Sequence, residues 1–315
     1  MQVARLIQGT EERRHGRRRG NLKGRSTELD ILKFMRLWMA VLCFATGLLA
    51  ADAKYDGSRV HYESYGKGPE AVVFIHGWTC DLTFWRGQAP VYQKRRALLV
   101  DLPGHGQSDK PDVAYTQERF ARAIDAVMRD AGVTRAVLVG HSMGGPVALT
   151  FLRLFPARTK ALVLVDAYMP ETPKDDAERA RQKAQMEPFL RSFGEPNYKE
   201  TVRKMIEGMF SAKTTPAQRE EIRTKMMATP QHVLASAIQD MFAIEAPKDG
   251  ETYGLPVMAI MRAAQVRPGF EARLRTVFPD LRKYESWEGS GHFLMMESPD
   301  RFNRALEDFL AGLIQ

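Results

Sequence analysis

The stretch RAVLVGHSMGGPVAL, residues 135–149, decides the fold. An apolar run of strand character leads into a glycine-flanked turn, and an apolar helical pattern begins directly after it. A strand that turns sharply into a helix exposes the side chain at the turn, and glycines two residues to either side remove side chains that would clash there. The stretch therefore predicts Ser142 as an exposed nucleophile; the alternative is a glycine-rich turn with a helix-capping serine. The predicted turn consists of Gly140, His141, Ser142, Met143 and Gly144.

Apolar runs of strand length recur on both sides of this stretch, with helical patterns between them. The clearest helical pattern, QERFARAIDAVMRDAG, begins after Thr116 and ends at Gly132, with its apolar residues on one face. Strands that are apolar throughout are typical of a sheet covered on both faces, so the alternation predicts an α/β fold with a mostly parallel sheet and helices on both faces. The expected strands are SRVHYESYG, AVVFIHG, RALLVDLPG, RAVLVGHS, KALVLVDA and LPVMAIM.

Residues 168–251 interrupt this alternation. They carry four helical patterns separated by prolines and no strand pattern. We expect a helical cap inserted between the two parts of the core, residues 56–167 and 252–315. Methionines recur on the cap helices and represent either ordinary core filling or an adaptable apolar lining over a substrate pocket. They are Met186, Met205, Met209, Met226, Met227 and Met241.

The positive charge lies mostly near the amino end of the chain. The 315 residues carry a formal net charge of +8, and residues 1–53 hold ten Lys or Arg against five acidic residues, so +5 lies there and +3 in the remainder. Residues 1–34 are basic and lack apolar periodicity, which predicts a disordered extension or an over-extended start. A nucleic-acid surface is therefore not expected on the rest of the chain.

An export leader is expected at residues 35–53. Met35-Arg36 precedes an apolar run of fourteen residues that ends at Ala51-Asp52-Ala53, an A-x-A cleavage pattern. The mature protein would then begin near Tyr55, lie in the periplasm or the medium, and have no stable association with a membrane. The alternative is an uncleaved membrane anchor.

A histidine is needed to take the proton from a serine nucleophile. His292, in WEGSGHFLMMESP, follows a short strand pattern and precedes a helix that begins at Ser298-Pro299, so we expect it in an exposed loop as the general base. A packed loop histidine is the alternative. His76 and His141 flank glycines in turns and are expected to shape the pocket, and His105 is expected to make structural hydrogen bonds.

Two backbone N–H groups are expected to stabilise a developing oxyanion. Met143 precedes the helix after Ser142, where a helix N-terminus favours negative charge. AVVFIHGWTC ends a strand with His76-Gly77-Trp78. Because Gly77 lets the backbone approach closely, the Trp78 N–H is the expected second donor; a plain turn is the alternative.

The motifs HGW, DLPGHGQS, GHSMGG and GSGHF, in this order and spacing, resemble the α/β-hydrolase superfamily over about residues 56–315. The resemblance implies the α/β-hydrolase fold. It does not imply a substrate, because the superfamily includes esterases, lipases, C–C bond hydrolases, cofactor-free haloperoxidases and catalytically reduced receptors. A serine rather than an aspartate at position 142 favours acyl chemistry over the chemistry of epoxide hydrolases and haloalkane dehalogenases.

The position where this superfamily usually carries its acid differs here. The strand LPVMAIM is followed by a loop with Arg262 and Gln265 but no nearby carboxylate. Asp166, at the carboxyl end of KALVLVDA, is therefore expected to orient His292, as in some superfamily members; a structural carboxylate or a helix cap is the alternative. Arg262 and Gln265 are then expected to line the pocket or support His292. Poorer candidates for the acid are Asp101, Asp249, Glu251 and Glu271.

The combined expectation is a serine hydrolase that cleaves a small or medium apolar carboxylic ester, with Ser142, Asp166 and His292 as its triad. The alternatives are a C–C bond hydrolase or a cofactor-free perhydrolase or haloperoxidase with the same triad, and a non-catalytic ligand-binding protein of this fold. The sequence has neither metal-ligand spacing nor a complete dinucleotide fingerprint. We therefore expect no metal or other cofactor, and a small-molecule ester as the partner.

Overall fold

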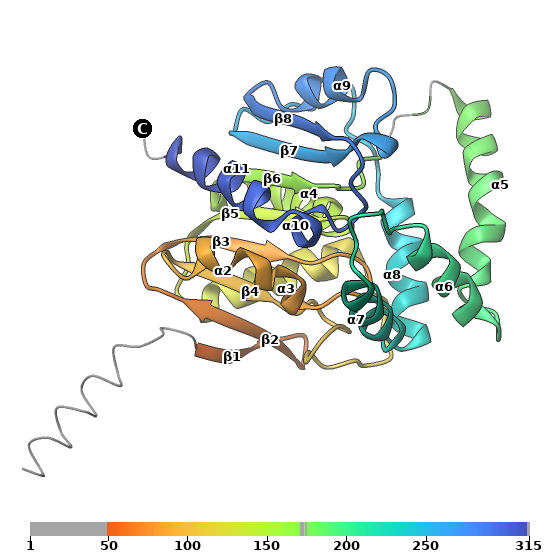
Figure 1. The fold of residues 1–315 in the computed structure, drawn as a ribbon, viewed down its shortest axis with the longest axis horizontal. Coiled ribbons are helices and arrows are strands. Elements are labelled where there is room, and N and C mark those ends of the chain that lie inside the picture. Colours follow the sequence, from red (N-terminus) through yellow and green to blue (C-terminus); the bar gives the residue numbers. More distant parts are fainter. Residues whose placement is uncertain (1–48, 171–172, 174, 314–315) are drawn as a thin grey trace, which may run out of the picture. The chain divides into compact units, whose positions relative to one another are not determined.

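A single eight-stranded sheet forms the centre of the molecule in the computed structural model, which describes residues 49–170, 173 and 175–313. The strand order is β1-β2-β4-β3-β5-β6-β7-β8 (Figure 1). β2 pairs antiparallel with β1 and β4, and all other neighbours are parallel. The predicted fold class is thus confirmed. The strands are β1 Leu49–Tyr55, β2 Ser58–Tyr65, β3 Glu70–Ile75, β4 Ala97–Val100, β5 Arg135–His141, β6 Thr159–Val165, β7 Val257–Arg262 and β8 Leu281–Trp287.

The central strands are apolar because helices cover both of their faces. Every residue of β4 is buried. The last five residues of β3, the last five of β6 and the first five of β7 are buried as well. Complete burial of one Val, Leu or Phe side chain contributes about 1.5–3 kcal/mol to the free energy of unfolding. The continuous apolar runs in the sequence therefore mark the core of the sheet.

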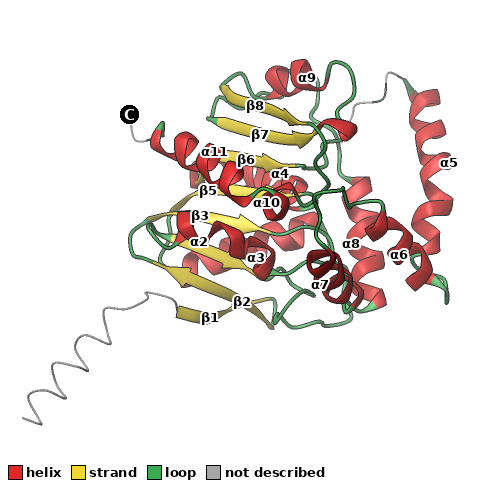
Figure 2. Cartoon of the chain, viewed as in Figure 1, coloured by secondary structure: helices red, strands yellow, loops and turns green. Residues whose placement is uncertain are grey.

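Helices α3 and α4 pack against each other on one face of the sheet, and α2, α10 and α11 lie together on the other (Figure 2). α3 begins where the sequence predicted, because the Thr116 side chain accepts a hydrogen bond from the Arg119 N–H and caps the helix. Its buried face includes Phe120 and Ile124. These helices and α9, which follows β7, are α2 Ala89–Tyr92, α3 Gln117–Asp130, α4 Gly144–Leu154, α9 Phe270–Val277, α10 Leu294–Glu297 and α11 Pro299–Ala311.

Four helices lie between β6 and β7 and form the predicted helical cap beyond the carboxyl ends of the parallel strands (Figure 1). A reciprocal capping box between Thr215 and Gln218 starts α7. α5 buries none of its side chains fully, and its Phe189 ring contacts the rings of Phe193 and Phe242. The cap helices are α5 Asp176–Ser192, α6 Tyr198–Glu207, α7 Pro216–Met227 and α8 Gln231–Ala243.

β1 is a strand that the sequence did not predict. It pairs with β2 along its whole length, and Ala53 is buried against the core. Asp52 lies 3.1 Å from both Arg59 Nη1 and His61 Nδ1. Residues 49–53 of β1 overlap the predicted leader, whose other residues, like the predicted extension 1–34, lie outside the described residues. Export therefore stays a prediction. Among the described residues, no helix is long and apolar enough to cross a membrane.

Candidate active site

Ser142 lies in the turn between β5 and α4, at the carboxyl end of a central strand. Its φ of 53° is in the left-handed region, which costs a non-glycine residue conformational energy. The flanking glycines permit this turn. A Cβ on Gly140 would lie 2.5 Å from the carbonyl carbon of Gly144, and a Cβ on Gly144 would lie 2.5 Å from the carbonyl oxygen of Ile75. The strained turn therefore depends on glycine at both positions.

The backbone N–H groups of Trp78 and Met143 are both available to an added acceptor. Met143 is the N-cap residue of α4, and both residues are buried. Neither N–H donates a hydrogen bond to any part of the chain that the structure describes. Gly77 brings the Trp78 backbone close, because a Cβ on Gly77 would lie 3.1 Å from Cβ of Ser142. Two unpaired donors beside a serine match the requirement for stabilising an oxyanion.

His292 lies in the loop between β8 and α10, where it is buried rather than exposed as expected, because its ring packs against His141 and Phe293 and contacts the Asp166 carboxylate. The distance between its Nδ1 and Asp166 Oδ2 is 2.5 Å. Because an ionised carboxylate only accepts hydrogen bonds, Nδ1 carries the proton and Nε2 is left with a lone pair. The ring centroid of His292 is 4.7 Å from that of His141, the residue before Ser142. A histidine in this tautomer, beside the serine turn, can act as a general base.

The backbone of His292 is held from two sides. Its N–H donates to the Met209 carbonyl of the cap at 2.8 Å, and its carbonyl accepts from His141 Nε2 at 2.9 Å. His141 is fully buried, and burial, together with the nearby His292, holds the pKa of its imidazole well below the usual value. His141 thus connects the serine turn to the histidine loop as a neutral donor.

Asp166 directly follows β6 and is the carboxylate that the structure brings to His292. Its φ is 42°, again in the left-handed region, and its side chain is 1% exposed. Oδ1 accepts the main-chain N–H of Arg262 at 2.9 Å. The Arg262 Nε lies 3.1 Å from Oδ2, within ion-pair distance but without hydrogen-bond alignment. A cation thus ends the strand after which the superfamily usually carries its acid, and it faces the Asp166 carboxylate.

The other predicted pocket residues occupy different positions. His76 is fully buried, and its ring joins two loops: Nδ1 donates to the Gly77 carbonyl, and Nε2 accepts from the Leu102 N–H at 3.0 Å. Burial lowers the pKa of His76 to about 4. Both of its nitrogens are engaged, so it is not available as a base. Gln265 is exposed, and its Oε1 accepts from Arg262 Nη2 at 2.9 Å.

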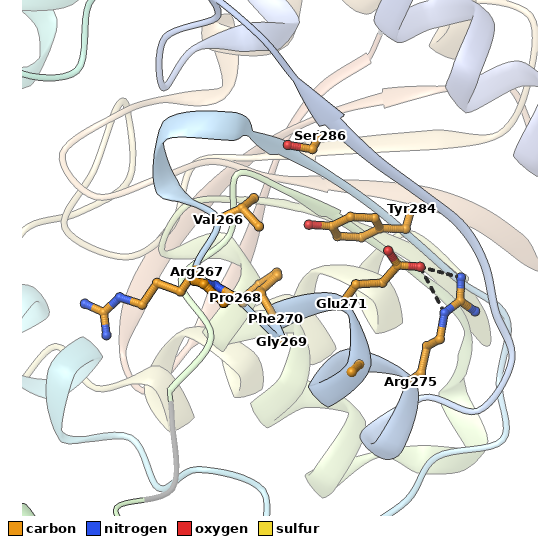
Figure 3. A pocket seen from close by; sticks show the side chains of 10 residues that line it. Val266, Arg267, Pro268, Gly269, Phe270, Glu271, Arg275, Tyr284 and Ser286 are labelled. Carbon is orange, nitrogen blue, oxygen red and sulfur yellow. Dashed lines mark hydrogen bonds and ion pairs between the residues drawn. The ribbon is translucent and has the colours of Figure 1, made fainter.

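The poorer acid candidates are engaged elsewhere. Glu271 forms an ion pair with Arg275 in a surface pocket of about 610 Å³ beside β8 and α9 (Figure 3). Glu251 pairs with Arg153 at 2.8 Å, and Asp249 is exposed. Asp101 accepts the N–H groups of Leu82 and Gln107, each at 2.8 Å, and organises its loop.

Three features of the site were not predicted from the sequence: the Met209 carbonyl that holds His292, the ion pair between Arg262 and Asp166, and Glu297. The Glu297 carboxylate accepts the N–H of Gly291, next to His292, at 2.8 Å. Its position five residues after His292 is visible in the sequence, but its contacts depend on the cap. Within the described residues, no group of three His, Cys, Asp or Glu side chains is placed to hold a metal ion.

The chain is similar to known proteins over most of its length. The sequence profile of the alpha/beta hydrolase family matches residues 72–305. An uncharacterized protein of Mycobacterium bovis is 38% identical over 112 residues, which are 35% of this chain and 33% of that protein. The chain thus spans about a third of the length of this relative.

Two further proteins are similar over nearly their whole length. The 2-hydroxy-6-oxononadienedioate/2-hydroxy-6-oxononatrienedioate hydrolase of Burkholderia vietnamiensis is 28% identical, over 83% of this chain and 96% of its own. The structure of a thermophilic esterase from Thermogutta terrifontis superposes with a TM-score of 0.68 and 25% identity, over 84% of this chain and 99% of the esterase.

Proposed function

The chain belongs to the alpha/beta hydrolase family, and on that premise we propose that it is a serine hydrolase that cleaves a small or medium apolar carboxylic ester through an acyl-enzyme on Ser142. The observation that carries the proposal is the contact of His292 Nδ1 with the Asp166 carboxylate at 2.5 Å, beside a serine on a strained turn. The buried, unpaired N–H groups of Trp78 and Met143 support it.

In the proposed mechanism, His292 Nε2 takes the proton from Ser142 Oγ as that oxygen attacks the ester carbonyl carbon. The Trp78 and Met143 N–H groups donate hydrogen bonds to the oxyanion that forms. The imidazolium then gives its proton to the departing alcohol, and the acyl group stays on Ser142. A water molecule, deprotonated by His292, attacks the acyl carbon and releases the carboxylic acid and the serine.

Asp166 keeps the His292 proton on Nδ1 throughout this cycle and stabilises the imidazolium once it forms. Its carboxylate is buried and accepts hydrogen bonds from His292 and from the Arg262 main chain, so it is held in one orientation. The Arg262 Nε lies 3.1 Å from the same carboxylate oxygen that contacts His292. Chain order Ser142, Asp166, His292 is the order of serine, acid and histidine in this family.

The cap is the proposed source of substrate selection. Trp78, whose N–H is a proposed oxyanion donor, also donates its Nε1–H to the Leu234 carbonyl of α8 at 2.8 Å. Its ring packs edge-on against Phe193 of the cap at 5.4 Å. These contacts support an apolar environment between cap and core, which favours an apolar acyl or alcohol group over a charged one.

A second candidate function is cleavage of a carbon–carbon bond next to a carbonyl by the same three residues. The similarity to the hydrolase of Burkholderia vietnamiensis, which covers most of both chains, supports it. Turnover rates of p-nitrophenyl esters of increasing acyl length, compared with those of vinylogous diketone acids, separate ester cleavage from carbon–carbon bond cleavage. Turnover of the diketone acids above that of every ester would replace the esterase proposal with this one.

The direct test of the esterase proposal is covalent labelling by a fluorophosphonate probe. We expect mass spectrometry to find the phosphonyl group on Ser142 and turnover of p-nitrophenyl esters to vanish in Ser142→Ala. Ser192→Ala is the matched control, because the Ser192 hydroxyl donates to the Phe189 carbonyl within α5 at 2.6 Å and has no role in the proposed mechanism. Full turnover in Ser142→Ala would overturn the proposal.

We further propose that residues 35–53 act as an export leader. Cleavage after Ala53 would remove five of the seven residues of β1, including Ala53 and Asp52, which contact the core and β2. Because this pairing stabilises the sheet, cleavage after Ala53 is expected to lower the free energy of unfolding of the exported protein. N-terminal sequencing of protein recovered from the periplasm or medium tests the position of cleavage, and full-length protein found only in the cytoplasm would contradict export.

A further inference from the structure

A carboxylate outside the proposed triad connects the cap to the loop of the proposed base. Glu297, in α10, accepts the Gly291 N–H through Oε2 at 2.8 Å. Its Oε1 accepts the hydroxyl groups of two cap residues, Ser211 at 3.0 Å and Thr214. Hydrogen bonds to an ionised acceptor are about twice as strong as those between neutral groups. One side chain thus holds the cap turn after α6 and the residue next to His292.

The same cap turn also contacts the histidine loop through its backbone. The His292 N–H donates to the Met209 carbonyl at 2.8 Å. The two segments are so close that a Cβ on Gly291 would lie 2.7 Å from the Met209 oxygen and 2.9 Å from the Ser211 nitrogen. The backbones of the cap turn and the loop are thus in direct contact, so a shift of one segment alone would break these contacts.

Two more hydrogen bonds extend this contact along the loop. Lys213 Nζ donates to the Glu288 carbonyl at 3.2 Å, and Gln218 Nε2 donates to the Met296 carbonyl at 2.8 Å. Residues 209–218 of the cap thus hold the loop before and after His292. Other ties between cap and core, such as the ion pair of Glu221 on α7 with Arg86, do not touch this loop.

We propose that Glu297 is a positioning residue through which the seated cap places His292 against Asp166 and Ser142. The inference rests on the proposed function and adds that the reaction proceeds efficiently only while the cap turn 209–214 is docked on Glu297. A displacement of a catalytic group by about 1 Å lowers a rate by up to about a hundredfold. The rate of acylation is therefore coupled to the seating of the cap.

Three variants of the full chain test this coupling. Glu297→Gln keeps the shape of the side chain but removes its charge and one of its acceptor oxygens. Ser211→Ala/Thr214→Val removes the cap donors, together with the backbone N–H bonds of Ser211 and Lys213 that their hydroxyl groups accept, and keeps both partners of the bond between Gly291 and Glu297. Glu221→Gln is the matched control, because it weakens a tie between cap and core that is remote from His292.

We expect kcat for a p-nitrophenyl ester to fall about ten- to a hundredfold in Glu297→Gln and at least about fivefold in the double variant, with KM changed less than about twofold. Glu221→Gln is expected to keep the wild-type kcat. A wild-type kcat in Ser211→Ala/Thr214→Val would overturn the coupling, because the loop would then not need the cap. An equal fall of kcat in Glu221→Gln would also overturn it, because any loosening of the cap would then suffice.

Hydrogen exchange of the peptide 288–297, followed by mass spectrometry, gives a readout that does not depend on activity. We expect faster exchange in Glu297→Gln and in the double variant than in the wild type and Glu221→Gln. Unchanged exchange in both would overturn the inference even if the enzyme is an esterase. If the variants exchange this peptide faster but the wild-type protein neither hydrolyses esters nor reacts with fluorophosphonate, the contact between cap and loop is supported and the proposed function is contradicted. Circular dichroism of each variant identifies a loss of fold.

Discussion

Replacement of Asp166 by Asn is expected to remove nearly all of the proposed esterase activity and to leave the fold in place. Asn has the shape of Asp, and its single oxygen can still accept the Arg262 main-chain N–H that Oδ1 accepts at 2.9 Å. Its NH2 group then takes the place of Oδ2, which lies 2.5 Å from His292 Nδ1. Because an NH2 group only donates, Nδ1 must accept, and the proton of the neutral ring moves to Nε2.

In this tautomer Nε2 has no lone pair to accept the serine proton, so the base is lost without a change of shape. In a serine protease of unrelated fold the corresponding exchange lowers kcat about 10⁴-fold, which is about 5.5 kcal/mol of transition-state stabilisation. Here the exchange also removes the charged partner of Arg262, whose side chain is 19% exposed and whose Nε lies 3.1 Å from Oδ2. Loss of such a buried ion pair is expected to lower the free energy of unfolding by about 3 kcal/mol.

The assay is steady-state hydrolysis of a p-nitrophenyl ester, with urea unfolding of the same preparations. Glu271→Gln is the comparison, because Glu271 is a carboxylate that follows β7 but pairs with Arg275. We expect kcat to fall about 10⁴-fold in Asp166→Asn and less than about twofold in Glu271→Gln. A folded Asp166→Asn variant that keeps more than about a tenth of the wild-type kcat would refute this role of Asp166. A large loss of kcat in Glu271→Gln alone would identify Glu271 of α9 as the acid.

Two further predictions concern charge. Arg262→Met is expected to lower kcat about tenfold, because the Asp166 carboxylate loses the cation beside it but keeps the main-chain N–H. An unchanged kcat would mean that only the main chain of Arg262 contributes to the site. Burial lowers the pKa values of His76 to about 4 and of His105 to about 3, and it lowers that of His141 strongly. The unfolded chain binds these protons below about pH 6.5, so the free energy of unfolding is expected to fall as the pH drops from about 6.5 toward 4, by about 2 kcal/mol per histidine at pH 5. Urea unfolding at pH 8 and pH 5 measures this loss, and equal midpoints would contradict it.

The sheet and the cap could be predicted from the sequence because both follow local patterns. Strands such as β4 and β6 are buried on both faces and therefore read as short apolar runs. The cap helices carry their own start signals, such as Thr215 before Pro216. β1 could not be predicted in this way, because Leu49–Tyr55 is an edge strand whose first residues continue the apolar run of the predicted leader.

In the candidate site, too, features with a local sequence pattern could be predicted and those that depend on long-range contacts could not. The serine turn has a local signature. Because no carboxylate lies in the loop directly after β7, the sequence also favours Asp166, which the structure places at His292. The contacts of Glu297 with Ser211 and Thr214 join residues more than eighty positions apart and follow only from the docking of the cap. No single-residue pattern encodes such a contact, since the same Glu on an exposed helix would look identical in the sequence.

The pairing of β1 with β2 makes proteolytic processing a determinant of self-association. β1 is the edge strand that covers β2, and every residue of Leu49–Tyr55 has a partner in β2. A molecule cut after Ala53 would present the outer backbone N–H and C=O groups of β2 to solvent, and such an edge is a template for a strand from another chain. Whether the protein is cut at Ala53 would then decide which strand, β1 or β2, forms the edge of the sheet that is open to a neighbour.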